Sequence, residues 1–139
     1  ADFVIYDAAA GLGEEAVSGM EAADELIIVT NPEIPAVTDA LKTAKLAEEM
    51  GKNVIGVIVT RVKGSRSEMP LTNIKEMLDL PILGVVPEDT HIQQALSEKD
   101  AVYHTHPKSK SARAYKQIAA KLAGVNYKER SFFDRVFSR

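Results

Sequence analysis

The chain has 139 residues, enough for one compact domain with its own core. It is 45% hydrophobic and 27% charged with a formal net charge of −3, which is ordinary for an α/β domain and gives no electrostatic case for general nucleic-acid binding. It contains no cysteine, which excludes disulfides, thiolate metal sites and iron–sulfur clusters formed by these residues.

Four continuous apolar runs rich in β-branched residues predict strands, each closed by polar or turn residues. They lack the polar alternation of a half-exposed strand, so we expect a parallel sheet that is covered on both faces. The runs cover residues 3–6, 26–29, 54–59 and 82–86.

Helical patterns separate the strands, and alternating strands and helices predict a doubly wound α/β fold with helices on both faces of the sheet. Four strands make this sheet look incomplete. The chain also begins with Ala1, directly ahead of a predicted strand, as if it had been cut there. The predicted helices cover residues 14–23, 36–50, 71–78, 92–99 and 109–122.

An acid and a glycine follow the first predicted strand, in the order Asp7-Ala8-Ala9-Ala10-Gly11. Ligands of open α/β sheets bind outside the carboxyl ends of the strands. An aspartate there suits Mg²⁺ held through its water shell, and a glycine lets the backbone approach a phosphate. The alternative is an ordinary turn residue or helix cap.

The three histidines lie at positions 91, 104 and 106 in a polar stretch. With no pair of carboxylates near them in the sequence, we expect solvated surface side chains and no zinc site.

Three segments in their order along the chain resemble the MinD/ParA family of deviant Walker A P-loop ATPases. Residues 2–13 are similar to the family's second phosphate-binding segment, and residues 21–42 to its next strand, loop and helix, with Asn31-Pro32-Glu33 typical of the MinD branch. Pro87-Glu88-Asp89 is similar to the late nucleotide loop. The resemblance implies a three-layer P-loop NTPase fold with a mostly parallel sheet, and ATP and Mg²⁺ as ligands.

The resemblance extends only to the C-terminal half of the family's domain. The Gly-rich phosphate loop with its lysines, together with its strand and helix, has no counterpart in this chain. We therefore expect the missing half to have been cleaved, deleted or supplied by another chain. The isolated chain should then be no ATP hydrolase, whereas the restored protein should be one.

Roles for single residues follow from the resemblance by position. Asp7 would hold the magnesium water shell and Gly11 would sense the γ-phosphate. Glu33 would lie near the ribose or the partner subunit of an ATP-bound homodimer, and Asp39 would lie on the helix that relatives use for regulator binding. The adenine pocket would be lined by Thr60, Arg61, Pro87, Glu88 and Asp89.

Each role has a simpler alternative. Glu33 and Asp39 are acids near a helix start, where the helix dipole favours them, and Arg61 is a possible surface charge. Two positions also depart from the family pattern, which has Pro where Ala9 stands and Asn where Thr60 stands. Threonine lacks the paired amide edge that helps to select adenine, so base discrimination is in question.

Residues 126–139 differ in character from the domain at 1–125. As a helix they would place Phe132, Phe133, Val136 and Phe137 within an arc of about 140°, with Arg135 just beyond one edge. A Phe-rich face flanked by basic residues is typical of an interfacial membrane helix, and MinD relatives end in a similar tail. The alternative is a terminal helix packed on its own domain.

Together these features favour a MinD-like positioning ATPase, cytoplasmic and peripheral on the inner face of the cell membrane. Its expected partners are a second copy, an anionic membrane surface and a regulator. One alternative is a ParA-like DNA-partition ATPase, although the lysines of the helix at 109–122 are more simply a solvated face. The other is a non-catalytic interaction module that has lost nucleotide binding.

Overall fold

The computed structural model describes residues 2–9 and 11–125 of the chain. Within them lies a sheet of three parallel strands in the order β1-β2-β3, namely β1 (Glu25–Thr30), β2 (Asn53–Val62) and β3 (Ile82–Pro87). Glu25 pairs with Asn53 at the start of β1, and Val57 pairs with Ile82 at the start of β3. The predicted parallel α/β fold is confirmed.

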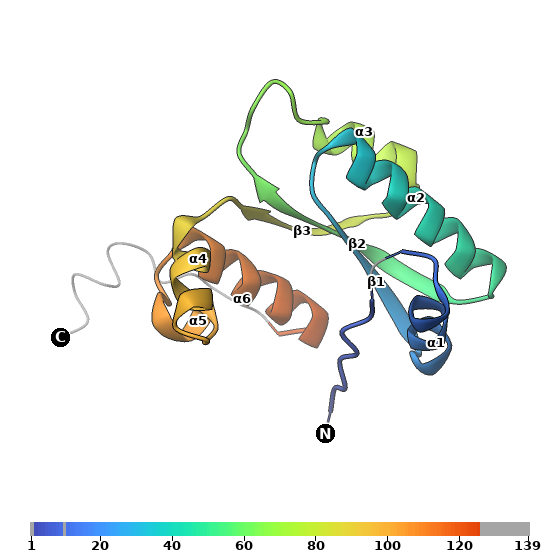
Figure 1. Ribbon diagram of the computed structural model, residues 1–139, viewed down its shortest axis with the longest axis horizontal. Coiled ribbons are helices and arrows are strands. Elements are labelled where there is room, and N and C mark those ends of the chain that lie inside the picture. The colour runs from blue at the N-terminus through green and yellow to red at the C-terminus, as the bar shows by residue number, and fades with distance from the viewer. Residues whose placement is uncertain (1, 10, 126–139) are drawn as a thin grey trace.

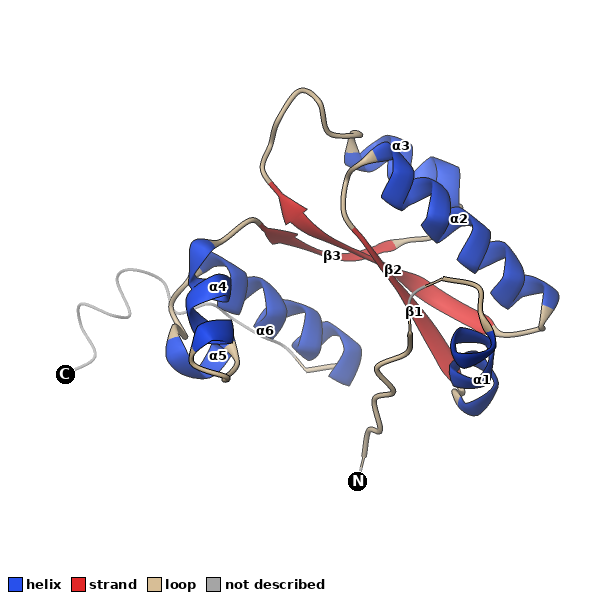
Figure 2. Ribbon diagram, viewed as in Figure 1, coloured by secondary structure: helices blue, strands red, loops and turns tan. Residues whose placement is uncertain are grey.

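Helices cover both faces of the sheet and make three layers (Figure 1). One face carries α2 (Ile34–Glu49) and α3 (Leu71–Leu78), and the other carries α6 (Lys110–Ala123). Two short helices, α4 (Thr90–Ser97) and α5 (Val102–Thr105), lie beside the start of α6, and α1 (Glu14–Ala22) lies at the β1 side (Figure 2). The sequence pattern did not predict the four-residue α5.

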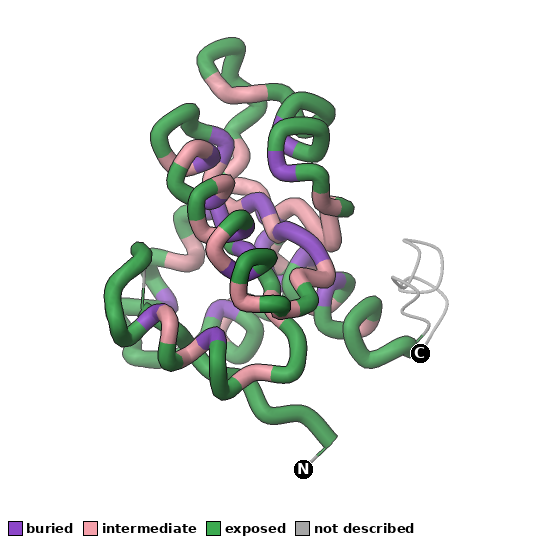
Figure 3. The backbone as a smooth tube through the Cα atoms, turned by 90° about the vertical axis from the view of Figure 1, so that its right-hand side faces the viewer, coloured by how far each residue is buried: buried purple, intermediate pink, exposed green. Residues whose placement is uncertain are grey.

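The core lies on the two sides of β2, because successive side chains of a strand point to opposite faces. Val57 and Val59 are fully buried against α2 and α3, together with Val37 and Ile74. On the other face Ile58 packs against a smaller cluster. The buried residues of that cluster are Val86, Ala114 and Ile118. Figure 3 marks the buried positions along the backbone in purple.

Close contact between α6 and β3 depends on Gly84. A Cβ atom at this position would lie 2.2 Å from Cγ1 of Ile118, far inside van der Waals contact. The absence of a side chain therefore lets the helix lie directly on the strand.

The predicted first strand is wrong for this chain. Residues 3–6 form no strand and run as an irregular segment away from the sheet (Figure 1). Their side chains are exposed, with Ile5 at 90% of its accessible area. A strand needs a neighbour to accept and donate its backbone hydrogen bonds, and β1 does not provide one to this segment.

The β1 side of the sheet is also open. Ile28 is buried under α2, whereas Ile27 and Val29 point to the opposite face and remain 36% and 62% exposed. Helix α6 covers that face over β3, so it leaves the β1 portion bare. None of the helices in the described part of the chain has the length and apolar character needed to span a bilayer.

Candidate functional site

The loops that follow β1, β2 and β3 meet at the carboxyl edge of the sheet and enclose an open cavity of about 200 Å³. Pro32 and Glu33 line it from the loop after β1, Arg61 from the end of β2, and Glu88 from the loop after β3. Glu33, Arg61 and Glu88 are separated by up to 55 positions in the sequence, and the fold brings them to one place. This edge is where open α/β sheets bind their ligands.

Arg61 and Glu88 face each other across the cavity. The Nε atom of Arg61 lies 3.6 Å from Oε2 of Glu88, which makes an ion pair without a hydrogen bond. Oε2 of Glu88 is shielded from solvent and has no hydrogen-bond partner among the described residues. This oxygen is therefore a buried acceptor beside the cavity that is compensated by the charge of Arg61 alone.

Backbone strain marks the same position. Arg61 has a φ of 58°, in the left-handed region that residues other than glycine rarely occupy. Strained backbone of this kind occurs preferentially at functional sites, where surrounding contacts hold it in place.

Three other residues predicted for the nucleotide site lie at or near the end of a strand or the start of a helix. Glu33 precedes α2 as its N-cap residue, and its backbone N–H donates to Oδ1 of Asn31 at 3.1 Å. Thr60 is half-buried and its hydroxyl donates to the carbonyl of Thr30, a long bond of 3.4 Å that links β2 to β1. Pro87 is the last residue of β3. Thr60 and Pro87 are not among the residues that line the cavity.

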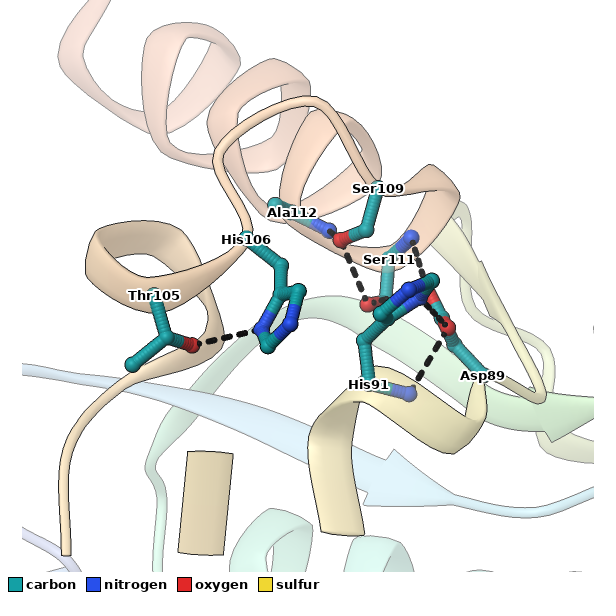
Figure 4. Close-up of polar contacts among 7 residues, drawn as sticks. All are labelled: Asp89, His91, Thr105, His106, Ser109, Ser111 and Ala112. Atoms are coloured by element: carbon teal, nitrogen blue, oxygen red, sulfur yellow. Dashed lines mark hydrogen bonds and ion pairs between the residues drawn. The ribbon is translucent and has the colours of Figure 1, made fainter. Parts of the chain in front are cut away.

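Asp89 is buried and its carboxylate is fully engaged within the chain (Figure 4). Oδ1 accepts from the backbone N–H of His91 at 3.1 Å and lies 2.7 Å from Nδ1 of the same residue. Oδ2 accepts from the backbone N–H and the hydroxyl of Ser111, at 3.0 and 2.8 Å. One carboxylate thus caps α4 and holds the start of α6.

The charge state of Asp89 follows from these contacts. Burial alone would raise the pKa of its carboxyl, but the hydrogen bonds from Ser111 and His91 outweigh that effect and hold the pKa well below its usual range. Asp89 is therefore an ionised residue with a structural role, and its expected part in an adenine pocket stays a prediction.

The histidines are more engaged than expected. His91 bonds the Asp89 carboxylate, and its ring lies 4.5 Å from the ring of His106 (Figure 4). Nδ1 of His104 lies 2.9 Å from a carboxylate oxygen of Asp100, which helps to lower the pKa of Asp100. His91 is thus part of the helix-capping network, which corrects the expectation that all three are simply solvated. Across residues 2–9 and 11–125, no three acidic or histidine side chains gather as a metal site.

The loop at residues 63–69 supplies the second half of the cavity lining, which sequence reasoning had missed. Lys63, Ser65, Ser67 and Glu68 line the cavity from this side. Polar character and Gly64 were the only signals of a loop here, and neither indicates that it folds back over the strand ends.

Asp7 and Gly11 are not among the residues that line this cavity. Asp7 is exposed in the irregular N-terminal segment, and Gly11 has a φ of 93°, a conformation that suits glycine. The cavity therefore includes neither of the two residues predicted to act on the phosphates.

The remaining predicted residues lie elsewhere. Asp39 is on the outer side of α2, where its side chain is 79% exposed and 3.9 Å from the ammonium of Lys42. The tail residues Phe132, Phe133, Arg135, Val136 and Phe137, and the boundary drawn at residue 125, lie at or beyond the end of the described residues.

Comparison with known protein families identifies a match over residues 1–123 to ParA, described as a NUBPL iron-transfer P-loop NTPase family. The chain belongs to the ParA family of P-loop NTPases. The 139 residues contain no cysteine whose thiolate could bind the iron named in that description.

Individual relatives within the ParA family agree with this placement. The chain is 39% identical over 126 residues, or 91% of its length, to an uncharacterized ATP-binding protein of Methanocaldococcus jannaschii, and it covers 48% of that protein. It is 30% identical over 154 aligned positions, or 98% of its length, to the septum site-determining protein MinD of Neisseria meningitidis serogroup B, and it covers 56% of it.

A solved structure extends the likeness to three dimensions. MinD of Pyrococcus horikoshii, determined in complex with Mg-ADP, superposes with a TM-score of 0.78 at 35% identity, over 88% of this chain and 52% of that one. The chain thus spans about half the length of the relatives it matches, and the incomplete P-loop NTPase fold expected from the sequence is confirmed.

Proposed function

We propose that this chain is the base-side half of a MinD-like ATPase and that a phosphate-loop half must join it before ATP binds tightly. The observation that carries this proposal is the cavity at the carboxyl edge of the sheet. It gathers Glu33, Arg61 and Glu88 from the carboxyl ends of three strands, within a chain that covers about half of its ATP-binding relative.

The missing half has a natural place against this chain. Phe3, Val4, Ile5 and Tyr6 are exposed, and the outward face of β1 exposes Ile27 and Val29. A strand between these two segments would give both a hydrogen-bonding neighbour and remove their side chains from water. Each such large side chain contributes about 1.5–3 kcal/mol when it is fully buried. We infer that the phosphate-loop strand and helix occupy this space.

Asp7 would then face the phosphates. A single carboxylate fits Mg²⁺ held through water, because this ion keeps several waters and takes its remaining ligands from substrate phosphates. Bound there, Mg²⁺ would neutralise charge that develops on the transferred phosphoryl group. Asp7 would orient the hydration shell, and the backbone N–H of Gly11 would be free to approach the γ-phosphate.

The same proposal includes assembly and location. ATP would bridge two copies of the completed protein, with Glu33 near the ribose or the second copy. The dimer would present two C-terminal tails to an anionic membrane at the inner face of the cell. Two weak anchors on one particle raise the effective affinity by about 10²–10⁴. Such a cycle would position the cell-division apparatus or other machinery, under a regulator bound on α2 near Asp39.

A non-catalytic module is the second candidate, because the chain itself has no phosphate loop. A DNA-partition role receives less support. The ammonium of Lys116 on α6 donates to the carbonyl of Pro107 and lies 4.7 Å from the centre of the Tyr103 ring, so it is engaged within the chain.

The two candidates separate in one experiment. The completed protein is defined as this chain joined to the phosphate-loop half of a ParA-family relative. We expect the completed protein to hydrolyse ATP with Mg²⁺, whereas the 139-residue chain alone should not. No hydrolysis by a folded completed protein would favour the non-catalytic module.

A further inference from the structure

Two histidines lie side by side where α4 meets the segment between α5 and α6. His91 is in the first turn of α4, and His106 is the C-cap residue of α5. Their ring centroids are 4.5 Å apart and the ring planes are tilted by 42° (Figure 4). Both residues are half-buried, so water and small ions can still reach them. The fold thus brings together two imidazoles from separate helices.

The hydrogen bond of each ring decides which of its nitrogens carries the hydrogen. Nδ1 of His91 lies 2.7 Å from Oδ1 of Asp89, and a carboxylate can only accept. Nδ1 of His106 lies 2.9 Å from the hydroxyl oxygen of Thr105, whose own hydrogen is donated to the carbonyl of Ala101 at 3.3 Å. That hydroxyl oxygen therefore accepts from His106. Both neutral rings then carry their hydrogen on Nδ1 and a lone pair on Nε2.

The Nε2 atoms have no partner in the part of the chain that the structure describes. No hydrogen bond or ion pair among those residues involves either atom. Histidines that bind a metal usually have this arrangement, in which one nitrogen binds the ion and the N–H group of the other donates to a fixed acceptor. The negative charge of Asp89 beside His91 also makes that imidazole a stronger ligand.

The backbone holds both ligands in place before an ion binds. The N–H group of His106 donates to the carbonyl of Val102 at 2.8 Å, and the carbonyl of His106 accepts from the N–H group of Ser109 at 3.0 Å. The N–H group of His91 donates to Asp89. A buried apolar cluster joins α4, α5 and α6, namely Ala95, Val102 and Ala112. Such preorganisation lowers the entropic cost of binding.

The ring separation indicates which kind of ion fits. An imidazole nitrogen binds a first-row metal at about 2.0–2.1 Å, which places the ring centre about 3.2 Å from the ion. Two rings at 90° around one ion then have centres about 4.5 Å apart, which is the spacing of His91 and His106, whereas a tetrahedral zinc needs about 5.2 Å. Angles of 90° occur in square-planar and octahedral sites, which suit Cu²⁺ and Ni²⁺ with nitrogen ligands.

We propose that His91 and His106 chelate a divalent ion of the Ni²⁺ and Cu²⁺ class through their Nε2 atoms, with water in the remaining positions. Asp89 and Thr105 are positioning residues that fix the two rings. Two protein ligands are fewer than the four of a structural zinc, so the ion is exchangeable. Neither histidine lines the cavity at the carboxyl edge of the sheet, so the site is independent of the function proposed above.

The test is calorimetric titration of Ni²⁺ into the untagged 139-residue chain, with paramagnetic broadening of NMR signals to locate the ion. We expect one ion per chain and broadening centred on His91 and His106. His91→Asn and His106→Asn each keep a side-chain N–H donor in place of Nδ1 but lose Nε2. Each should weaken Ni²⁺ binding by at least about 100-fold, the upper end of what loss of an outer-shell partner costs.

His104→Asn is the matched control. Nδ1 of His104 also lies beside a carboxylate, but the ring next to it is Tyr103, which offers no nitrogen ligand. This variant should bind Ni²⁺ as the wild type does. Thr105→Val tests the positioning role, because it removes the acceptor of the His106 N–H group. We expect it to weaken Ni²⁺ binding by about 10- to 100-fold, and Thr105→Ser should restore the affinity.

Four results would overturn the proposal. The first is no saturable binding at millimolar Ni²⁺, and the second is wild-type affinity in either His91→Asn or His106→Asn. The third is an equal loss in His104→Asn, and the fourth is tighter binding of Zn²⁺ than of Ni²⁺. Melting curves without metal show whether each variant is folded. Ni²⁺ should raise the melting temperature of the wild type but not of folded His106→Asn, because the ion binds only the assembled site.

Discussion

The β1 side and the β3 side of the sheet differ in how many of their polar groups have hydrogen-bond partners within the chain and in how many of their apolar side chains are buried. At β3, one buried carboxylate caps two helices, and the strand-end loops are braced to one another. At β1, the outer edge has no neighbour in the described residues, and apolar side chains from residues 3–6 are exposed.

The contrast indicates which side of the molecule another piece must complete. β3 also has β2 as its one neighbouring strand among the described residues, but the carboxylate of Asp89 at its end already has partners, and α6 covers one face of the strand. Groups at the β1 side can gain both hydrogen bonds and burial. Under the proposed function, the chain itself supplies the core and the base-side cavity, and the missing half supplies the phosphate side.

The largest effect is expected at Asp7, on the incomplete side. In the completed protein, Asp7→Ala should lower Mg²⁺-dependent ATP turnover on the order of 10²–10³-fold, because the variant no longer orients the metal's water shell. Steady-state phosphate release measures this. Asp2→Ala, five positions earlier in the same exposed segment, is the control and should remain active. Turnover at the wild-type level in Asp7→Ala would place the metal elsewhere.

On the complete side, Asp89→Asn should lower the free energy of unfolding of the isolated chain by about 2–4 kcal/mol at neutral pH. The asparagine keeps one acceptor oxygen, so buried charge-assisted hydrogen bonds to His91 and Ser111 are lost. Urea unfolding followed by circular dichroism measures the change.

The same substitution has a pH signature. Because folding lowers the pKa of Asp89, its stabilisation is complete above its unfolded pKa of about 3.9 and is lost as the pH falls through the folded pKa. The wild type should therefore lose stability in acid faster than Asp89→Asn, and the two should converge. A constant difference between them down to the lowest accessible pH would contradict the assigned network.

The tail gives a smaller expected effect and belongs to neither end of the sheet. In the completed protein with ATP, Phe133→Glu should weaken binding to anionic vesicles by about ten- to hundred-fold, from the loss of one buried Phe. Vesicle sedimentation with and without ATP is the measurement. Ser138→Glu adds the same charge on the polar side of the expected helix and should bind more tightly than Phe133→Glu. Equal sedimentation of both variants would contradict the proposal that the Phe-rich face of the tail binds the membrane.

The smallest effect on the isolated chain is expected at Ile5. In the isolated chain this side chain is 90% exposed, so Ile5→Asp should change the free energy of unfolding by less than about 0.5 kcal/mol. In the completed protein the same change should cost about 2–4 kcal/mol, because the side chain becomes buried. Val57→Ala in the core should be destabilising in both proteins. An equal cost of Ile5→Asp in both would refute the proposed place of the missing half.

Continuous apolar runs rich in β-branched residues correctly predicted β1, β2 and β3, although one face of β1 is exposed in this chain. The same signal failed at residues 3–6, where the local pattern is present but the neighbouring strand is not. An apolar run indicates that a segment is suited to a buried strand. Whether the strand forms depends on a neighbouring strand to pair with, and the described residues provide none for residues 3–6.

The candidate site divides in the same way. Motif order pointed to Glu33, Arg61 and Glu88, which the fold brings together. It also pointed to Asp89, but it could not show that Ser111, 22 positions away, occupies that carboxylate. The lining contributed by Ser65, Ser67 and Glu68 was missed because a polar loop has no periodic pattern from which its path can be predicted.

Calorimetric titration of Mg-ATP into the isolated chain and into the completed protein tests the central claim most directly. The account predicts affinity in the micromolar range, on the order of −8 kcal/mol, for the completed protein only. The isolated chain should bind Mg-ATP far more weakly, because it lacks the phosphate loop. Micromolar binding by the 139-residue chain alone, or none by a folded completed protein, would contradict the claim that this chain is half of an ATP site.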